Sequence, residues 1–457
     1  MRDLALVGFL AGLIALGFRR PFLFVLAYAY VDIVSPQRLS YYMLNSVPVS
    51  LICVALAVLG WMVADDKRGM RFGGRQAIML MLLCYCGYTT MNADFPASAA
   101  EKWAWVWKAL AFAIFLPLTL RTRLRIEALS LFMILSAASI IIVGGIKTLA
   151  SGGGYGALNL MVDNNSGLYE SSTIATVAIA IVPLILWLSQ HGSIYPTDWR
   201  VKAFAWALCF ACLLIPIGTE ARTGLICIGL LAVLMIREVK KRGRYIAVLA
   251  LLGLCAVPML PSSFSDRMDT IKEYKADSSA STRIAVWKWT LGYVRDHPLG
   301  GGFDAYLQNK LVIDKVATTE DGGGQVIQAV QEFDKARAYH SGYFEMLGEQ
   351  GWPGLGLWLL LHGIGIARME AVRRRYRRRG KADEAWVAPL ATALQHGHLI
   401  YMTGSLFVGI AFQPFVYMLV GIEIGLDAYL RQRRAAEAWR PIVAKRTAAK
   451  PAVVAIS

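Results

Sequence analysis

Long apolar runs, separated by shorter polar stretches, fill most of this 457-residue sequence. Most runs are about 15–23 residues long, which is what a helix needs to cross the hydrocarbon core of a bilayer. Helix is expected because only a helix satisfies every backbone N–H and C=O within one segment. The pattern predicts an all-α polytopic membrane protein of about 12 transmembrane helices, with twelve or thirteen spans because the first two segments are short enough for a re-entrant hairpin. The candidate segments are 4–18, 21–35, 47–64, 77–93, 103–120, 126–149, 171–190, 202–219, 222–236, 244–261, 352–368, 386–406 and 411–430.

The polar segment 262–345 is far longer than the others, and it carries ten Lys/Arg and twelve Asp/Glu. A serine–threonine pair before Arg283 can cap a helix, and Pro298 with the glycines after it ends that helix. A second helix is expected over about 325–335, after a glycine-rich loop at 321–324. The chain therefore divides into 1–261 (N-terminal transmembrane helices), 262–345 (a mostly helical segment), 346–430 (C-terminal transmembrane helices) and 431–457 (a basic tail).

The net charge of +16 is concentrated in short loops. These basic loops alternate with poorly basic ones, which is the distribution described by the positive-inside rule. We therefore expect the basic loops and the tail in the cytoplasm, and segment 262–345 in the periplasm, outside the inner membrane. Topology and lipid contact account for the charge, so no nucleic-acid partner is expected. The basic loops are Lys67 to Arg75, Arg121 to Arg125, Arg200 to Lys202, Arg237 to Arg244, and Arg368 to Lys381.

Composition and motifs narrow the function classes. The hydrophobic fraction is 56% and the mean hydropathy +0.49, above the apolar content of soluble proteins. The seven cysteines all lie in or beside apolar runs, as small buried hydrophobes do. The sequence has no Walker loop, no Rossmann fingerprint after a strand, no His-Glu-x-x-His and no Asp-x-Asp motif. Neither a metal nor a nucleotide cofactor is expected.

A polar turn with Glu220 and Arg222 interrupts two apolar runs on the predicted periplasmic side. An arginine there runs against the positive-inside distribution, and an ionisable group at membrane depth is costly unless it has a partner. Either the two side chains pair to close the turn, or the guanidinium binds a phosphate, which it can hold through two hydrogen bonds.

Arg283 begins the body of the first helix predicted in the polar segment. With Trp287 and Lys288 it either belongs to a solvated surface or forms a second phosphate ligand. Free N–H groups at a helix N-terminus would favour the anion further.

The sequence Tyr339-His340-Ser341 lies where the polar segment re-enters the membrane. The pKa of histidine suits proton transfer at neutral pH, so His340 is the candidate base. Glu345 and Glu349 follow it and either orient a neighbouring group or cap the start of the next helix.

These residues resemble the O-antigen ligase/polymerase superfamily over about 205–365. The N-terminal sequences Met1-Arg-Asp-Leu and Asp65-Asp-Lys-Arg-Gly are similar to a branch described as exosortase-associated O-glycosylation ligases. One departure is Ser341, where many relatives have asparagine. The motifs that carry the resemblance are Arg222-Thr-Gly, Arg283 with Trp287 and His297-Pro298-Leu-Gly-Gly-Gly, and His340-Ser with Glu349-Gln-Gly-Trp-Pro-Gly.

The resemblance implies an inverting, metal-independent glycosyl transfer on the periplasmic side of the bacterial inner membrane. The donor would be a glycan on undecaprenyl pyrophosphate, and the acceptor a hydroxyl of lipid A-core. His340 would be the catalytic base, and Arg222 and Arg283 would bind the pyrophosphate in a cationic pocket. Possible supporting residues are Glu220, Lys288, Tyr339 and Glu345.

Three alternatives remain open. A polymerase that joins repeat units would use the same donor, and a protein O-glycosylation ligase would differ only in its acceptor. A non-catalytic transporter of lipid-linked glycans would carry ionisable residues deep in several spans, whereas the charges of this sequence cluster at loops.

Overall fold

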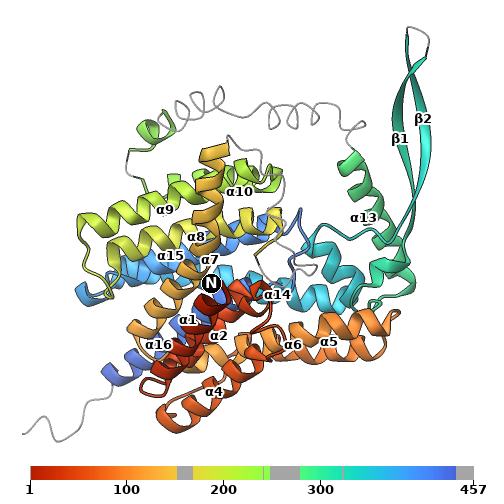
Figure 1. The fold of residues 1–457 in the computed structure, drawn as a ribbon. Coiled ribbons are helices and arrows are strands. Elements are labelled where there is room, and N and C mark those ends of the chain that lie inside the picture. The colour runs from red at the N-terminus through yellow and green to blue at the C-terminus, as the bar shows by residue number, and fades with distance from the viewer. Residues whose placement is uncertain (1, 152–167, 240, 248–277, 322–323, 439–457) are drawn as a thin grey trace, which may run out of the picture.

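The computed structural model describes residues 2–151, 168–239, 241–247, 278–321 and 324–438 (Figure 1). The helices before residue 240 are α1 (Arg2–Gly17), α2 (Phe22–Val34), α3 (Pro36–Leu39), α4 (Val49–Ala64), α5 (Gly74–Met91), α6 (Pro96–Thr119), α7 (Arg123–Ser151), α8 (Ser171–His191), α9 (Trp199–Gly218) and α10 (Arg222–Ile236). The later elements are α13 (Ser278–Asp296), η2 (Ala305–Gln308), β1 (Lys310–Asp321), β2 (Gly324–Lys335), α14 (Gly342–Arg379), η3 (Ala382–Glu384), α15 (Val387–Gly404) and α16 (Pro414–Ala438).

The apolar runs are helical wherever the structure describes them, so the prediction of a helical, multi-pass membrane protein is confirmed at that level. By length and hydropathy, four described helices can cross a membrane: α7, α8, α9 and α14. Three shorter apolar helices are α2, α4 and α10. The total of about 12 spans stays a prediction, and most of the predicted span 244–261 lies outside the described residues, as do 152–167, 248–277 and 439–457.

The predicted helix over 325–335 is wrong, because β2 occupies these residues. It pairs antiparallel with β1 along its whole length, from Lys310 opposite Lys335 to Asp321 opposite Gly324. Figure 1 shows this hairpin standing out from the helical body next to α13. The first predicted helix is present as α13, which begins earlier than expected, at Ser278, and ends at Asp296 as predicted.

Helix α14 folds back on itself at Gly351, whose φ of 61° and ψ of −167° lie outside the helical region. The rings of Tyr343 and Trp358 are 5.1 Å apart and edge-on, whereas in a straight helix these positions would be about 22 Å apart. Glycine is required at the bend because a Cβ there would lie 2.3 Å from the Pro298 carbonyl oxygen. The first part of α14, residues 342–350, is thus a short helix that lies beside the longer part after the bend.

The loop 298–302 is hydrogen-bonded to this bend. The N–H groups of Gly301 and Gly302 donate to the carbonyls of Gly348 and Glu349, and Trp352 N–H donates back to Pro298 O, over 2.9–3.1 Å. A Cβ on Gly300 would lie 2.5 Å from the Gly351 nitrogen. The two segments therefore approach at backbone contact distance.

The starts and the ends of α8 and α14 mark two opposite ends of the molecule. Glu170, before α8, and His340, before α14, line one cavity at what we call the His340 end. His191 at the end of α8 and Arg373 near the end of α14 line another at the opposite, basic end. Helix α8 is central, with nearly all its side chains buried.

Candidate functional site

His340 lies in the connection between β2 and α14, with a left-handed backbone φ of 47°. Histidine visits this region more often than most residues but still at a cost, so the conformation must be held by its surroundings. The Tyr339 carbonyl accepts a hydrogen bond from Trp287 Nε1 of α13 at 2.9 Å. The Trp287 ring stacks on Phe344 of α14 at 4.9 Å. Helix α13 thus holds the backbone before His340 and packs against a side chain after it.

The exposed side chain of His340 faces a cavity of about 440 Å³. The wall comes from α6, α14, η2 and the loop between α15 and α16. Its polar members are Ser98, Glu101, Lys102, Glu170, Asp304, Tyr306, Tyr339, His340, Glu345, Glu349 and Gln413. A cavity of this size can hold a sugar-sized group.

Partial burial and nearby positive charges keep the imidazole of His340 neutral at pH 7. Partial removal from water lowers the pKa of His340, the positive charges of Arg283 and Arg337 lower it further, and the carboxylate of Glu170 opposes them. A neutral imidazole can accept a proton, as a general base must.

Lys102 holds a cluster of carboxylates in the wall of the cavity. Its Nζ lies 2.7 Å from Glu345 Oε1, 2.8 Å from Glu349 Oε1 and 3.9 Å from Asp304 Oδ1. Glu345 also accepts from Ala411 N–H at 3.0 Å, and Asp304 from the Ser98 hydroxyl at 2.6 Å. One ammonium and several hydrogen bonds thus hold three carboxylates close together.

The predicted site residues are only partly gathered at this cavity. Tyr339 and Glu345 line it with His340, and Arg283 acts on His340 from α13. The exposed side chain of Lys288 lies outside the lining. The expectation of a pocket lined by cations is not met by this cavity, because carboxylates outnumber its single lysine and the arginines lie outside the wall.

Glu220 and Arg222 lie outside the lining but at the same end of the bundle. Arg222 is the first residue of α10. In the first turn of α10, a Cβ on Gly224 would lie 3.0 Å from Ala175 Cβ in α8. Glu170, the N-cap of α8, is one of the charges that act on His340. Arg222 is therefore near the level of the cavity.

Lys102 and Asp304 were not anticipated. The sequence does contain a signal for Lys102, which precedes an apolar run on the predicted periplasmic side. A basic residue on that side runs against the positive-inside distribution, and the same feature singled out Arg222. Asp304 carries no such signal, because its place beside Lys102 depends on the fold of the loop 298–302.

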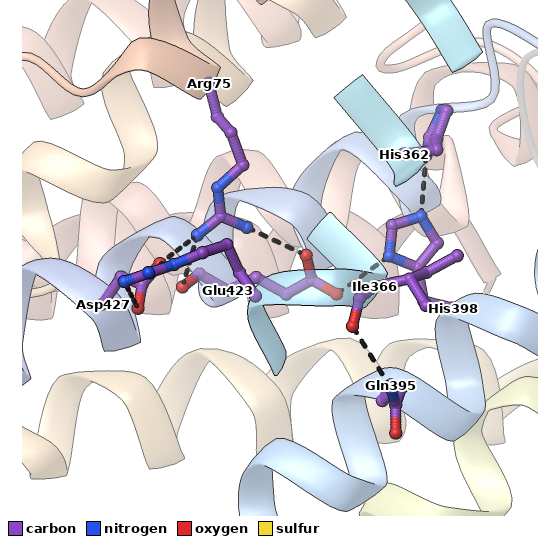
Figure 2. Close-up of polar contacts among 8 residues, drawn as sticks. Arg75, His362, Ile366, Gln395, His398, Glu423 and Asp427 are labelled. Carbon is purple, nitrogen blue, oxygen red and sulfur yellow. Dashed lines mark hydrogen bonds and ion pairs between the residues drawn. The ribbon is translucent and has the colours of Figure 1, made fainter. Parts of the chain in front are cut away.

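A second polar cluster is buried between α5, α14, α15 and α16 (Figure 2). His362 Nδ1 lies 2.7 Å from His398 Nε2, and His398 Nδ1 lies 2.8 Å from Glu423 Oε1. Arg75 continues the chain at 3.2 Å from Glu423 Oε2 and 2.6 Å from Asp427 Oδ2. Arg75, expected in a basic loop, is therefore buried, because two acidic residues of α16 draw its guanidinium into the bundle.

Among the residues that the structure describes, no group of three or more His, Cys, Asp or Glu side chains is arranged to hold a metal ion. Metal-independent chemistry remains a prediction.

Comparison with known proteins identifies the family. Residues 1–193 match a family of unknown function (DUF5935), and residues 207–359, which include Arg222, Arg283 and His340, match a family described as O-antigen ligase. No curated protein matches the chain. With its apolar helices, the chain is a multi-pass membrane protein, and the match over 207–359 supports its membership of the O-antigen ligase superfamily of ligase- and polymerase-type membrane glycosyltransferases.

Proposed function

We propose that this protein transfers a glycan from undecaprenyl pyrophosphate to a hydroxyl of lipid A-core, on the periplasmic side of the inner membrane. The transfer inverts the anomeric centre and uses no metal. The observation that carries the proposal is His340, which is held by α13 in a cavity and kept neutral by its partial removal from water and by Arg283.

In the proposed step, the acceptor oxygen bonds to the anomeric carbon while the bond from that carbon to the pyrophosphate breaks. His340 takes the hydroxyl proton and later releases it to water. Undecaprenyl pyrophosphate leaves with the bonding electron pair. Only proton transfer and charge stabilisation are required of the protein.

The arginines would stabilise the departing pyrophosphate from beside the cavity. A guanidinium binds phosphate oxygens through two hydrogen bonds and stays charged at every relevant pH. Arg283 supports this role because its charge already reaches His340. Arg222 begins α10 at the same end, where the helix N-terminus adds N–H groups that favour an anion.

The carboxylates around Lys102 would hold the acceptor. Their oxygens accept hydrogen bonds only, and sugar hydroxyls can donate to those left free by the lysine. Glu345 and Glu349 lie on the short first part of α14, which begins two residues after His340. This spacing supports an acceptor that is held by the carboxylates while one of its hydroxyls faces the base.

The decisive experiment is transfer by purified protein with synthetic undecaprenyl-pyrophosphate glycan and lipid A-core. His340→Ala should reduce transfer by on the order of 10²-fold or more. His297→Ala is the matched control, because that exposed ring lies outside the cavity lining, and it should transfer within a few fold of wild type. Retained activity in folded His340→Ala protein would reject the general-base role.

The polymerase and the protein O-glycosylation ligase use the same donor, so the product separates them. A deletion strain that accumulates lipid-linked polymer and bare lipid A-core supports the ligase. A deletion strain whose lipid A-core still carries glycan, but with shorter glycan chains, supports the polymerase. A glycan on protein Ser/Thr supports the third activity.

The second buried cluster gives the transporter alternative a specific observation. The charges were expected to cluster at loops, yet His398 and Glu423 are fully buried inside the helical bundle (Figure 2). Such groups mark ion or substrate pathways in many membrane proteins. Glycan joining by detergent-purified protein, where no gradient can exist, would exclude transport as the sole function.

A further inference from the structure

We propose that the cavity at the basic end is a binding site for an anionic phospholipid, with the phosphate headgroup between Arg377 and His396. This site is separate from the His340 cavity and does not depend on the proposed transfer. It lies between the ends of α8, α10 and α14 and the start of α15.

The cavity has a volume of about 520 Å³ and two kinds of wall. One part is apolar and comes from side chains of helices within the bundle, among them Leu186, Trp187, Met235 and Pro389. The other part is polar and includes Gln190, Arg373, Arg377 and His396. A lipid presents the same division, with an apolar chain next to a charged headgroup.

The polar wall leaves positive charge unbalanced. Arg373 is paired with Glu370 at 2.9 Å and with Glu238 at 3.6 Å. Arg377 has no ion-pair partner within the described ranges. A basic cavity between transmembrane helices, at the side where basic loops gather, is typical of a site for phosphate headgroups.

His396 provides an independent observation. Its side chain is only 2% exposed, and no hydrogen-bond partner to it is found among the residues that the structure describes. The positive charges of Arg237 and Arg373 act on this imidazole. The ring lines the cavity, where a phosphate oxygen would accept a hydrogen bond from it and meet the surrounding positive charge.

A lipid fits this cavity better than a soluble phosphate. A free anion would leave the apolar part of the wall uncovered, whereas an acyl chain would cover it and contribute through burial. The apolar wall comes from α8, α10 and α15. Of these, α8 is long and apolar enough to span a membrane, and α10 is a shorter apolar helix. The headgroup would thus lie at the membrane surface, with its chain against these helices.

The test uses the full chain, purified in neutral detergent and stripped of lipid. Bound phosphatidylglycerol and phosphatidylcholine are counted by native mass spectrometry, and inorganic phosphate is added in a separate arm. Two variants on neighbouring positions of α14 are compared, Arg377→Gln and Arg378→Gln. Both remove one exposed positive charge, but only Arg377 lines the cavity.

We expect phosphatidylglycerol to bind in preference to phosphatidylcholine. Arg377→Gln should weaken its binding about fivefold, since one basic side chain at an anionic lipid surface contributes on that order. Arg378→Gln should bind like wild type. Equal loss in both variants would overturn the proposal in favour of general attraction to a basic surface. Equal binding of phosphatidylcholine, or displacement of the lipid by inorganic phosphate at comparable concentration, would overturn it as well.

Discussion

At the scale of single residues, His340 combines an unusual backbone with a tuned side chain. Its backbone φ is positive, and the neighbouring Tyr339 carbonyl is held by Trp287. The sequence predicted the chemical type and the place of this residue, because a histidine at the end of a long polar segment is uncommon. It did not predict Lys102 and Asp304, since these two come from other parts of the chain and meet Glu345 and Glu349 only in the fold.

The first prediction concerns pH. The pKa of His340 is lowered by desolvation and by Arg283, so the neutral base predominates at pH 7 and is lost as pH falls through a value below the usual 6.5. kcat/KM should therefore fall on the acid side with a midpoint below 6.5. Arg283→Gln should move this midpoint upward, because it removes a positive charge that disfavours protonation.

The control for this measurement is Arg295→Gln, which changes an exposed arginine in the last turn of the same helix. It should leave the midpoint where wild type has it. An acid limb that does not move in Arg283→Gln would mean that the titrating group is not His340, or that Arg283 does not act on it during catalysis.

The second prediction concerns Lys102. Lys102→Met should destabilise the protein by about 3–5 kcal/mol, because Glu349, which is fully buried, would be left without its counter-charge. The double variant Lys102→Met with Glu349→Gln should recover part of this loss, since the fully buried charge of Glu349 is then removed, while Glu345 and Asp304 still lack the ammonium. Thermal unfolding of the detergent-solubilised protein measures both. A single variant as stable as wild type would show that the carboxylates hold their protons or have other partners.

At the scale of elements, the helices could be predicted and the hairpin could not. The helices follow from apolar length, which only helix can satisfy within a membrane. In 324–335 the apolar residues recur at helical spacing, yet the backbone pairs with β1. The preceding stretch contains several β-branched residues followed by glycines, which is a hairpin signal. Pairing with the neighbouring strand β1 thus outweighed the helical spacing of the apolar residues.

The third prediction concerns the bend of α14. Gly351→Ala should reduce both the folded yield in membranes and transfer, because its Cβ would meet the Pro298 oxygen and the carbonyl carbon of Leu299. The strained φ adds on the order of 1–3 kcal/mol. Gly356→Ala is the control in the same helix, where an added Cβ has no neighbour within 4 Å. That variant should fold normally, and equal behaviour of the two would show that the bend is not required.

At the scale of the whole molecule, the two cavities lie at opposite ends of the same helices. The alternation of basic loops predicts which end faces the cytoplasm, and the family match agrees with a membrane enzyme. How many helices cross the bilayer is harder to read, because α5, α15 and α16 carry the buried charges and imidazoles of Figure 2 and so are less apolar than simple spans.

The fourth prediction tests this orientation. Arg295→Cys, beside the His340 end, should react with a membrane-impermeant maleimide in intact cells. Arg378→Cys, at the basic end, should react only after the inner membrane is permeabilised. Labelling of the wild-type chain, which has seven cysteines, gives the background to subtract. The reverse pattern would place the His340 cavity in the cytoplasm and remove the proposed periplasmic reaction.

The joint between loop 298–302 and the bend at Gly351 limits how this scaffold can be altered. Each segment lacks a side chain where the other's backbone lies, and hydrogen bonds run in both directions between them. A chimera that takes only one of the two segments from a relative would combine a loop and a bend whose backbones do not fit each other. The two stretches are almost fifty residues apart in sequence, but a chimera must replace both of them together.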